Sequence, residues 1–229
     1  MKATLLESRE IAPDVRHFVF EVPDMSQISF LPGQWVSFEE IINGDPITRA
    51  YSIASPPDGN RFELCLNRVE SGHLSPFLFR MQPGESLEMK GPYGSFVWRE
   101  PANDSVLVAT GTGIAPFRGM LQARLGNDGS HKIKLLFGVR HERGLLYRAE
   151  FEELERSHPN FRFWPTLTRP ELSWQGRTGR VQQHLGEAIG DRRDIEVYIC
   201  GLREMVDDVR ARLKAMGFER KHIIYEKYD

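Results

Sequence analysis

A glycine-rich turn follows directly on a short run of apolar residues near the middle of the chain. Residues 105–109 have the apolar, β-branched composition of a buried parallel strand, and Gly111-Thr112-Gly113 comes just after them. A helix is predicted over 115–125, with Pro116 in its first turn, where a missing N–H costs nothing. A strand, a glycine turn and a helix N-terminus direct backbone N–H groups and a positive dipole end at an anion. The segment therefore predicts a pyrophosphate site, although Pro116 stands where the usual dinucleotide fingerprint has a third glycine.

A second group of residues suited to a flat, phosphorylated ligand lies earlier in the chain. Arg49, Ala50, Tyr51 and Ser52 stand in a segment of alternating apolar and polar residues, which is typical of an antiparallel strand. An arginine guanidinium makes paired, charge-assisted hydrogen bonds to a diphosphate. Tyr51 shares the strand face of Arg49 and can stack on a planar ring. In this order, the two segments predict a flavin site followed by a pyridine nucleotide site, and the implied chemistry is electron transfer.

With two further motifs, these segments resemble the ferredoxin–NADP reductase superfamily over nearly the whole chain. The four motifs are Arg49-x-Tyr51-Ser52, the turn from Gly111 to Pro116, Gly91-Pro92-x-Gly94-x-Phe96 and Cys200-Gly201-Leu202-x-x-Met205. The resemblance implies a bound FAD and a reaction that passes electrons between a pyridine nucleotide and another carrier.

For the flavin, the resemblance implies that Arg49 binds the pyrophosphate, that Tyr51 beside Ala50 stacks on the ring, and that Ser52 hydrogen-bonds near the reactive N5. It also implies a second pyrophosphate-binding segment, where a strand leads to a glycine and a helix N-terminus offers N–H groups. Ser75 has the alternative role of a simple helix cap, and His73 is expected to have no part in proton transfer. The residues of this segment are Asn67, Arg68, Val69, Gly72, His73, Leu74 and Ser75.

For the nucleotide, the resemblance implies that Thr112 lies near the nicotinamide and that Cys200 ends a strand opposite the reacting ring. Cys200 is thus a predicted catalytic residue, like Ser52, although a cysteine before a glycine is usually a small buried residue. Hydride transfer needs two rings held close with water excluded, rather than an acid or a base. The other residues assigned to this site are Gly111, Gly113, Ala115, Pro116, Gly201, Leu202 and Met205.

The choice between NADPH and NADH depends on residues that could meet a 2′-phosphate. Thr168 and Arg169 resemble the Ser/Thr-Arg pair of the NADP-using members, and Arg180 resembles a second phosphate contact. Arg140 is a further predicted cofactor-binding residue, with no particular role assigned to it. No acidic residue stands at 168 or 169, whereas NAD-preferring proteins often carry a carboxylate there. We therefore expect NADPH, and NADH stays possible if Arg169 and Arg180 are only solvated loop charges.

An aromatic residue near the C-terminus completes the candidate site. Several branches of the family place a terminal aromatic ring over the open face of the flavin, and Tyr228 is predicted to take this catalytic position. Asp229 follows it, whereas the plant-type enzymes end at the tyrosine itself. The alternative is that Tyr225 or Tyr228 completes a last strand.

The pattern of strands and turns predicts two domains. Residues 1–99 have short strands between Pro-Gly and Asp-Gly turns, which is typical of an antiparallel β-barrel, here the FAD domain. Residues 103–229 alternate strands and helices, which is typical of an α/β doubly wound parallel sheet, here the NAD(P) domain. Barrel strands are expected at 4–6, 15–22, 34–38, 50–54, 62–69 and 86–89, with a helix at 74–79. The second domain is expected to have strands at 106–109, 133–138, 161–166 and 197–200, and helices at 115–125, 148–156, 181–189 and 204–216.

Composition excludes several function classes. The chain has 229 residues, a formal net charge of -2 and 40% hydrophobic residues, which is too balanced to imply nucleic-acid binding. It lacks both the run of roughly 20 apolar residues that a membrane helix needs and a signal-peptide core. We therefore expect a cytoplasmic monomer with no membrane partner and no metal. Cys65 and Cys200 are too few for an iron–sulfur cluster with four thiolates, so the electrons must pass to a separate acceptor.

The predicted function is that of an FAD-dependent oxidoreductase that transfers electrons between NADPH and a one-electron carrier, ferredoxin or flavodoxin. Flavin is the natural converter between hydride and single electrons. One alternative is an NAD(P)H:flavin reductase or the reductase component of an oxygenase. A second alternative, from a different class, is a redox-sensing regulatory subunit of a larger complex.

Overall fold

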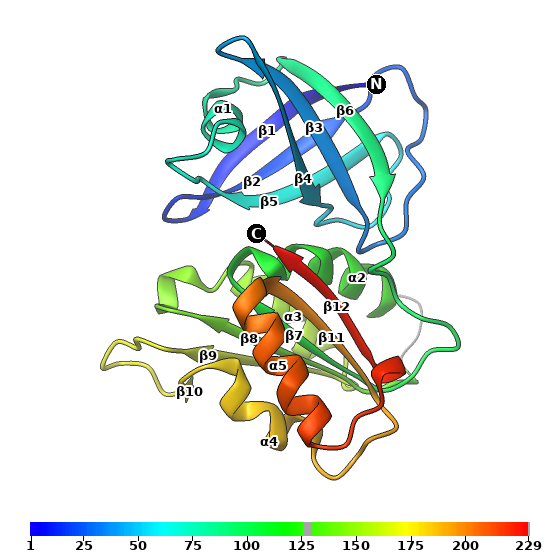
Figure 1. Cartoon of the computed structure of the whole chain (residues 1–229), viewed down its shortest axis with the longest axis vertical. Coiled ribbons are helices and arrows are strands. Elements are labelled where there is room, and N and C mark those ends of the chain that lie inside the picture. Colours follow the sequence, from blue (N-terminus) through cyan, green and yellow to red (C-terminus); the bar gives the residue numbers. More distant parts are fainter. Residues whose placement is uncertain (126–129, 229) are drawn as a thin grey trace. The chain divides into compact units, whose positions relative to one another are not determined.

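The computed structural model describes residues 1–125 and 130–228 and divides the chain into two compact units. The first unit consists of Met1–Trp98 and Ala115–Ala123, and the second of Arg99–Ile114 with the chain from Arg124 onward. The chain thus returns to the first unit for most of helix α2 (Ala115–Leu125), which follows the glycine turn. Figure 1 labels the elements of both units.

The first unit is an antiparallel sheet of six strands in the order β4-β3-β6-β1-β2-β5. A bridge between Ile53 and Leu64 and a hydrogen bond from the Ala54 N–H to the Glu63 carbonyl (2.7 Å) join the ends of β4 and β5, which closes the sheet into a barrel. The elements are β1 (Lys2–Ala12), β2 (Val15–Glu21), β3 (Trp35–Ile42), β4 (Asp45–Ser52), β5 (Arg61–Asn67), the helix α1 (Leu74–Arg80) and β6 (Ser86–Tyr93).

Aromatic side chains fill the barrel. Phe18 and Phe20 are buried on one face of β2, with the half-buried Val19 between them, as the period of a strand requires. The ring of Phe20 lies 5.0 Å from that of Phe38 and 5.6 Å from that of Phe62, centroid to centroid. Such pairs add to the free energy of burial. This core sets the strand register and leaves the outer edge of β4 open up to the bridge at Ile53.

The second unit is a sheet of six parallel strands in the order β10-β9-β8-β7-β11-β12. The chain moves outward from β7 to β10 and then returns to β11 on the other side of β7. The carboxyl ends of β7 and β11 therefore form a topological switch point, where open α/β sheets bind ligands. The strands are β7 (Ser105–Thr110), β8 (Ile133–Val139), β9 (Phe161–Leu167), β10 (Arg177–Thr178), β11 (Glu196–Leu202) and β12 (Ile223–Tyr228).

Helices and short 3₁₀ turns connect the strands of this sheet. The helices are α3 (Arg148–Ser157), α4 (Leu185–Ile189) and α5 (Arg203–Ala215), and the turns are η1 (Gly111–Ile114), η2 (Glu142–Gly144), η3 (Val181–His184) and η4 (Arg220–His222). Figure 1 shows α4 and α5 on one side of this sheet. Of the helices in residues 1–125 and 130–228, none is long and apolar enough to cross a membrane.

The predicted fold class is confirmed for both domains, and the differences lie in single elements. The strands expected at 34–38 and 50–54 are longer in the structure, β3 (Trp35–Ile42) and β4 (Asp45–Ser52), and meet in a hairpin. The predicted helix at 181–189 is divided into η3 and α4. Strand β1 continues to Ala12 through two register shifts, which break the alternation that would reveal its length. The two-residue strand β10 is too short to leave a pattern in the sequence. β12 is the last strand expected under the alternative interpretation of Tyr225 and Tyr228.

Helix α2 packs on the barrel unit with one backbone directly against another. A Cβ atom on Gly119 would lie 2.5 Å from the Ser55 carbonyl oxygen and 3.1 Å from the Ser55 nitrogen. Both atoms belong to the backbone and cannot rotate away. Gly119 is thus required by the close approach of α2 to the chain that follows β4.

Replacing Gly119 by alanine is expected to lower the free energy of unfolding by about 1–3 kcal/mol, because overpacking of a tight site costs that much. The usual gain of roughly 1 kcal/mol from removing a helical glycine is outweighed here. Gly186→Ala in α4 is the matched control, because a Cβ atom on Gly186 would have no atom within 4 Å, and it should be neutral or stabilising. Urea unfolding of both variants tests this; equal stability of the two would contradict it.

His17 gives the barrel a pH dependence. It is 3% exposed, and its Nε2 lies 3.7 Å from Glu63 Oε2. Burial, with smaller effects of Arg118 and Arg9, lowers the pKa of His17 from 6.5 to about 4. The unfolded chain therefore binds this proton more readily than the folded protein.

We expect the folded protein to lose stability as the pH falls from 6.5 to about 4, because His17 must take up its proton at a lower pH when folded than when unfolded. His17→Gln should show a shallower loss over this window. The measurement is the urea midpoint against pH for both proteins. The carboxylates titrate in both proteins, so the difference between the two curves reports the contribution of His17. Parallel curves of urea midpoint against pH would show that His17 contributes nothing.

Candidate functional site

The strand predicted to carry the flavin, β4, presents Arg49 and Ala50 to solvent. Tyr51 is half-buried and Ser52 is buried. Arg49 Nη1 donates to the Thr48 carbonyl (2.7 Å), which leaves most of its guanidinium donors facing outward. The ring of Tyr51 lies 5.9 Å from that of Phe38 and packs on the barrel core. The exposed cation of Arg49 thus lies two residues from the Tyr51 ring, which packs on the barrel core. This arrangement suits a phosphorylated planar ligand.

Burial also fixes the protonation state of Tyr51. It raises the pKa of the phenol, and the nearby Arg49 lowers it by less. The ring is therefore neutral at physiological pH. A neutral aromatic ring that cannot move away is suited to stacking and not to proton transfer.

The second predicted segment follows β5 and leads into α1. Its exposed residues are Asn67, Arg68, Val69 and His73, while Gly72 is half-buried and Leu74 and Ser75 are buried. The Ser75 hydroxyl accepts a hydrogen bond from the Val69 N–H (3.0 Å), so it closes this turn. This hydrogen bond supports the alternative, structural role of Ser75. Both β5 and α1 contact β4, so the structure brings this segment beside the strand of Arg49.

The glycine turn and the Cys200 motif meet at the switch point of the second unit. A Cβ on Gly113 would lie 2.4 Å from the Cys200 carbonyl oxygen and 2.8 Å from the Gly201 Cα. A Cβ on Gly201 would lie 2.7 Å from both Met205 Cε and Thr110 Oγ1. Backbone therefore meets backbone at Gly113, and a side chain there would separate the turn from the end of β11, whereas a side chain at Gly201 would meet the side chains of Met205 and Thr110.

The other predicted residues of the turn have distinct surroundings. Gly111 is exposed and has φ +53°, a conformation that favours glycine, and Thr112 is half-buried. Leu202 is 63% exposed. Ala115 and Pro116 are buried in the first turn of α2. The structure thus leaves Gly111 at the start of the turn and the side chain of Leu202 exposed, while Gly113 and Ile114 are buried.

Cys200 is wholly buried. Burial raises the pKa of its thiol, the Glu226 carboxylate raises it further, and a hydrogen bond with the Tyr228 hydroxyl lowers it by less. The thiol therefore stays protonated and cannot act as a thiolate nucleophile. This agrees with a reaction in which Cys200 contributes small size rather than acid–base chemistry.

Tyr228 belongs to β12, where it lies opposite Leu202 in a parallel pair with β11. Its hydroxyl is engaged by Cys200. The structure therefore shows this tyrosine in a last strand of its own domain. Its predicted position over the flavin stays a prediction.

The three residues predicted for the 2′-phosphate, Thr168, Arg169 and Arg180, line a single pocket of about 470 Å³ together with Arg140, another predicted cofactor-binding residue. The pocket lies where β8 and β9 end and where β10 leads into η3. Backbone hydrogen bonds from the Thr168 N–H to the Val139 carbonyl (3.1 Å) and from the Arg169 N–H to the Arg140 carbonyl (2.8 Å) join the two strand ends. The lining residues are Arg140, Thr168, Arg169, Gly179, Arg180 and Gln183.

The backbone of Arg180 is held by a capping box. Gln183 Oε1 accepts from the Arg180 N–H (3.0 Å), and the Gln183 N–H donates to the Arg180 carbonyl (3.0 Å). Gly179 has φ +100°, and a Cβ there would lie 1.8 Å from Gln183 Oε1. The His184 ring Nε2 lies 3.0 Å from the Thr178 carbonyl. The loop that carries Arg180 is thus fixed before any ligand binds.

The charge in this pocket is not neutralised by the protein. Within residues 1–125 and 130–228, no hydrogen bond or ion pair engages the guanidinium of Arg140, Arg169 or Arg180. The nearest acidic residue in sequence, Glu171, instead pairs with His141 (3.5 Å). Three exposed guanidinium groups around one cavity make a site for a multiply charged anion such as a phosphate monoester.

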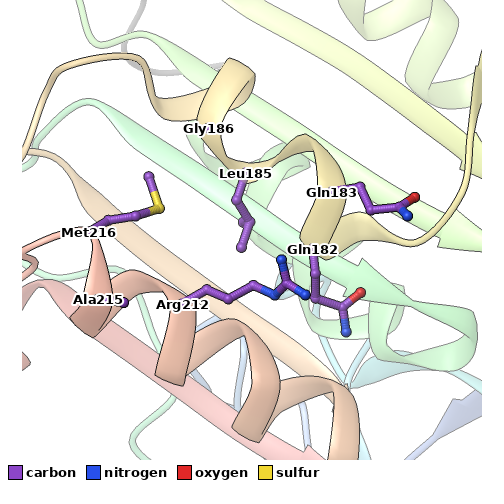
Figure 2. Close-up of a pocket in the computed structure, with 7 residues that line it drawn as sticks. All are labelled: Gln182, Gln183, Leu185, Gly186, Arg212, Ala215 and Met216. Carbon is purple, nitrogen blue, oxygen red and sulfur yellow. The ribbon is translucent and has the colours of Figure 1, made fainter.

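A second hollow, of about 390 Å³, lies between η3–α4 and the end of α5 (Figure 2). Its cation, Arg212, is paired with Asp208 (3.2 Å), and the buried Gln182 Oε1 has no hydrogen-bond partner among the described residues. None of the predicted residues lines it. It is therefore a weaker anion site than the arginine pocket.

Sequence reasoning missed Gln183 and Gly179 as parts of the site. A signal was present, since Arg180 is followed three residues later by a glutamine, which is the spacing of a capping box, and is preceded by a glycine. The helix predicted over 181–189 begins one residue after this cap. The role of Gln183 could have been inferred from that boundary.

The barrel, the parallel sheet and these sites define a two-domain oxidoreductase that binds a flavin and a pyridine nucleotide. Residues 2–98 match the oxidoreductase FAD-binding domain family, and residues 107–211 match the oxidoreductase NAD-binding domain family. The chain is 42% identical over its whole length to ferredoxin–NADP reductase B of Sorangium cellulosum, of which it spans 97%. It therefore belongs to the ferredoxin–NADP reductase superfamily.

Two further proteins show how widely this arrangement is used. The toluate 1,2-dioxygenase electron transfer component of Pseudomonas putida is 28% identical over 99% of this chain, which spans 67% of that protein. The crystal structure of the Amycolatopsis cytochrome P450 reductase GcoB is 28% identical, with a TM-score of 0.89, over 99% of this chain and 69% of that one. The chain thus spans nearly the whole length of the Sorangium cellulosum protein and about two thirds of the length of the toluate 1,2-dioxygenase component and of GcoB.

Replacing Gln183 by methionine is expected to lower the free energy of unfolding by about 1 kcal/mol, because the Arg180 N–H loses its capping acceptor. Methionine keeps the length of the side chain and removes only the amide. Gln175, an exposed glutamine of the same domain, provides the matched control Gln175→Met. Thermal or urea unfolding of both variants is the measurement. Equal stability of the two would show that the cap contributes nothing.

Proposed function

We propose that this protein transfers electrons between NADPH and a separate one-electron carrier, ferredoxin or flavodoxin, through a bound FAD. The observation that carries the choice of nucleotide is the pocket with the unneutralised guanidinium groups of Arg140, Arg169 and Arg180. A phosphate monoester is an anion and accepts several charge-assisted hydrogen bonds from guanidinium groups. A free ribose hydroxyl carries no charge to attract them. The 42% identity to a ferredoxin–NADP reductase over the whole chain supports the choice of carrier.

The residues of the first unit fit a flavin with a pyrophosphate. Arg49 offers outward-facing donors on the open edge of β4, and Tyr51 offers a neutral ring braced by Phe38. The segment from Asn67 to Ser75, beside β4, offers the exposed cation of Arg68. FAD, when bound, supplies the conversion between a hydride and two single electrons.

The residues of the second unit orient the nucleotide. Gly113 lets the turn after β7 approach the backbone at the end of β11, at the switch point where open α/β sheets bind ligands. Thr112 lies in this turn, and the arginine pocket would hold the far end of the nucleotide. Cys200, with its buried neutral thiol, keeps a charged group away from the reacting carbon.

The partner is proposed to be a separate protein. Within residues 1–125 and 130–228 no group of three or more His, Cys, Asp or Glu side chains could hold a metal ion. We therefore propose that the redox centre that takes up single electrons belongs to the carrier. We also propose that the protein acts as a monomer in the cytoplasm, where NADPH is available.

A second candidate is the reductase component of an oxygenase. The similarity to the toluate 1,2-dioxygenase electron transfer component of Pseudomonas putida favours it. This chain spans 67% of that relative. Preference for NADH would favour this candidate.

The test of the function is NADPH-dependent reduction of purified ferredoxin, followed by the change in its visible absorbance, with flavodoxin and free FMN as alternative acceptors. Reduction of ferredoxin or flavodoxin by a yellow preparation that keeps its FAD supports the proposal. Fast reduction of free FMN with no reduction of either carrier would replace it by a flavin reductase. A protein that is reduced by neither nucleotide would overturn the enzyme function.

Replacing Arg169 or Arg180 by alanine is expected to weaken NADPH use by about 10- to 100-fold, because a charge-assisted hydrogen bond is worth about 1.5–3 kcal/mol. NADH use should change by less than about threefold, since NADH has no 2′-phosphate. Arg143→Ala, an exposed arginine of η2, is the matched control. Steady-state kinetics with both nucleotides gives the ratio. Equal losses for NADPH and NADH would contradict the phosphate role.

A further inference from the structure

The arginine pocket stays positively charged although acidic residues lie close to it along the chain. Glu142 comes two residues after Arg140, and Glu171 comes two residues after Arg169. Two residues span at most about 7 Å of chain, so a glutamate and an arginine at this spacing can reach one another. Neither glutamate lines the pocket, and within residues 1–125 and 130–228 neither pairs with one of its arginines. Other contacts must therefore hold both carboxylates.

We propose that His141, together with the backbone N–H of Glu142, holds the Glu171 carboxylate out of the arginine pocket, and that His141 thereby determines the preference for a nucleotide with a 2′-phosphate. The inference rests on the proposed function, since it takes the arginine pocket as the phosphate site. It gives a role to a residue that binds no ligand in that proposal. His141 acts through Glu171 and is therefore a positioning residue.

The Glu171 carboxylate contacts the start of η2 through both of its oxygens. Oε2 accepts a hydrogen bond from the Glu142 N–H (3.3 Å), and Oε1 lies 3.5 Å from Nδ1 of His141. The N–H of Glu171 itself, the Glu142 N–H and the His141 ring lower the pKa of this carboxyl by more than partial desolvation raises it. Glu171 is thus an anion at neutral pH, and both of its oxygens are engaged at η2.

The backbone around Glu171 is also fixed. The hydrogen bond from the Arg169 N–H to the Arg140 carbonyl (2.8 Å) joins the chain after β9 to the chain after β8, two residues before Glu171. The Glu171 carbonyl accepts from the Trp174 N–H (3.0 Å), which closes a turn. The ring N–H of Trp174 donates to the Arg177 carbonyl (2.9 Å). Loss of the His141 contact should therefore change the direction of the Glu171 side chain, and leave its backbone in place.

Two other carboxylates on the elements around the pocket are held by arginines. Glu142 of η2 pairs with the Arg148 guanidinium. Glu187 of α4, the helix that follows η3, accepts from Arg177 Nη2 (2.9 Å). The charge of an arginine partner is permanent. Glu171 is held by a histidine and one backbone N–H instead, so it is the carboxylate that a single substitution should release.

A released Glu171 would oppose the binding of a phosphate in two ways. Its carboxylate would compete with the phosphate for the Arg169 guanidinium. It would also repel the negative charge of the phosphate. A ribose hydroxyl would meet neither obstacle, because it is neutral and can donate a hydrogen bond to a carboxylate, as in NAD-binding sites of open α/β sheets. The direction of the Glu171 side chain therefore decides between two nucleotides that differ only in the 2′-phosphate.

The experiment measures nucleotide binding to the purified FAD-loaded protein by calorimetry at low ionic strength, where charges are screened least. The Kd values for NADP⁺ and NAD⁺ are determined for the wild type, His141→Ala, His141→Asn, Glu171→Gln and the double variant H141A/E171Q. His131→Ala is the matched control, since His131 lies 3.8 Å from the Asp104 carboxylate in the same domain and does not line the pocket. The readout is the ratio of the two Kd values, because a general loss of structure would weaken both nucleotides alike.

We expect His141→Ala to weaken NADP⁺ binding about three- to fivefold, because exposed charges interact weakly, and to change NAD⁺ binding by less than about twofold. Glu171→Gln should bind both nucleotides within about twofold of the wild type, since the carboxylate is already held outside the pocket. The double variant should bind NADP⁺ like Glu171→Gln, because no carboxylate is left to release. His141→Asn keeps a donor near the place of Nδ1 and should keep the wild-type ratio.

Three results would overturn the inference. One is a ratio of Kd values in His141→Ala that equals the ratio in His131→Ala. Another is a double variant that binds NADP⁺ as weakly as His141→Ala, which would mean that His141 acts on the nucleotide without Glu171. The third is a gain in NADP⁺ affinity of about threefold or more in Glu171→Gln, which would mean that the carboxylate already acts on the phosphate in the wild type. A wild-type protein that binds NADP⁺ no more tightly than NAD⁺ would instead overturn the proposed choice of nucleotide.

Discussion

Two glycines determine how this chain can be folded, because at each of them one backbone lies directly on another. Gly113 rests on Cys200 and Gly201 at the switch point of the parallel sheet, and Gly119 rests on Ser55 beside the barrel. Both stand within seven residues of chain around the start of α2. A methyl group at either place would separate the elements that carry the candidate sites. The glycine-rich turn therefore serves packing at least as much as the binding of a phosphate.

The chemistry of the sites follows from which charges are compensated and which are not. Arg118 is buried and paired with Glu63, so its charge holds the structure together. Arg140, Arg169 and Arg180 are exposed around one cavity and have no acidic partner among the described residues, so their charge is available to a ligand. Holding these three apart from carboxylates costs little in water, because exposed charges are well solvated. The same residue type thus has a structural or a binding role according to burial.

Much of this could be predicted from sequence, because the signals were local. The alternation of apolar residues predicts the barrel strands, and the strand, glycine turn and helix from 105 to 125 predict the central part of the second domain. The residues around the arginine pocket follow separate strands but share the carboxyl edge of one parallel sheet, which is why Thr168 and Arg180 could be grouped.

What could not be predicted depends on contacts between distant residues. The pairing of Arg118 with Glu63 joins positions 55 residues apart, and nothing near either residue indicates the other. The engagement of Tyr228 by Cys200 depends on β12 lying beside β11, which the sequence leaves open. The capping of Arg180 by Gln183 was local and could have been found.

The measurement that tests the account most directly is anaerobic single-turnover reduction of the wild-type protein by NADPH and by NADH, followed by bleaching of the flavin absorption band. The account predicts a yellow protein that NADPH bleaches at least about tenfold more efficiently than NADH, because the arginine pocket recognises a phosphate that only NADPH carries. Equal or better bleaching by NADH would contradict the role of the pocket. A colourless protein would contradict the assignment of Arg49 and Tyr51 to a bound flavin.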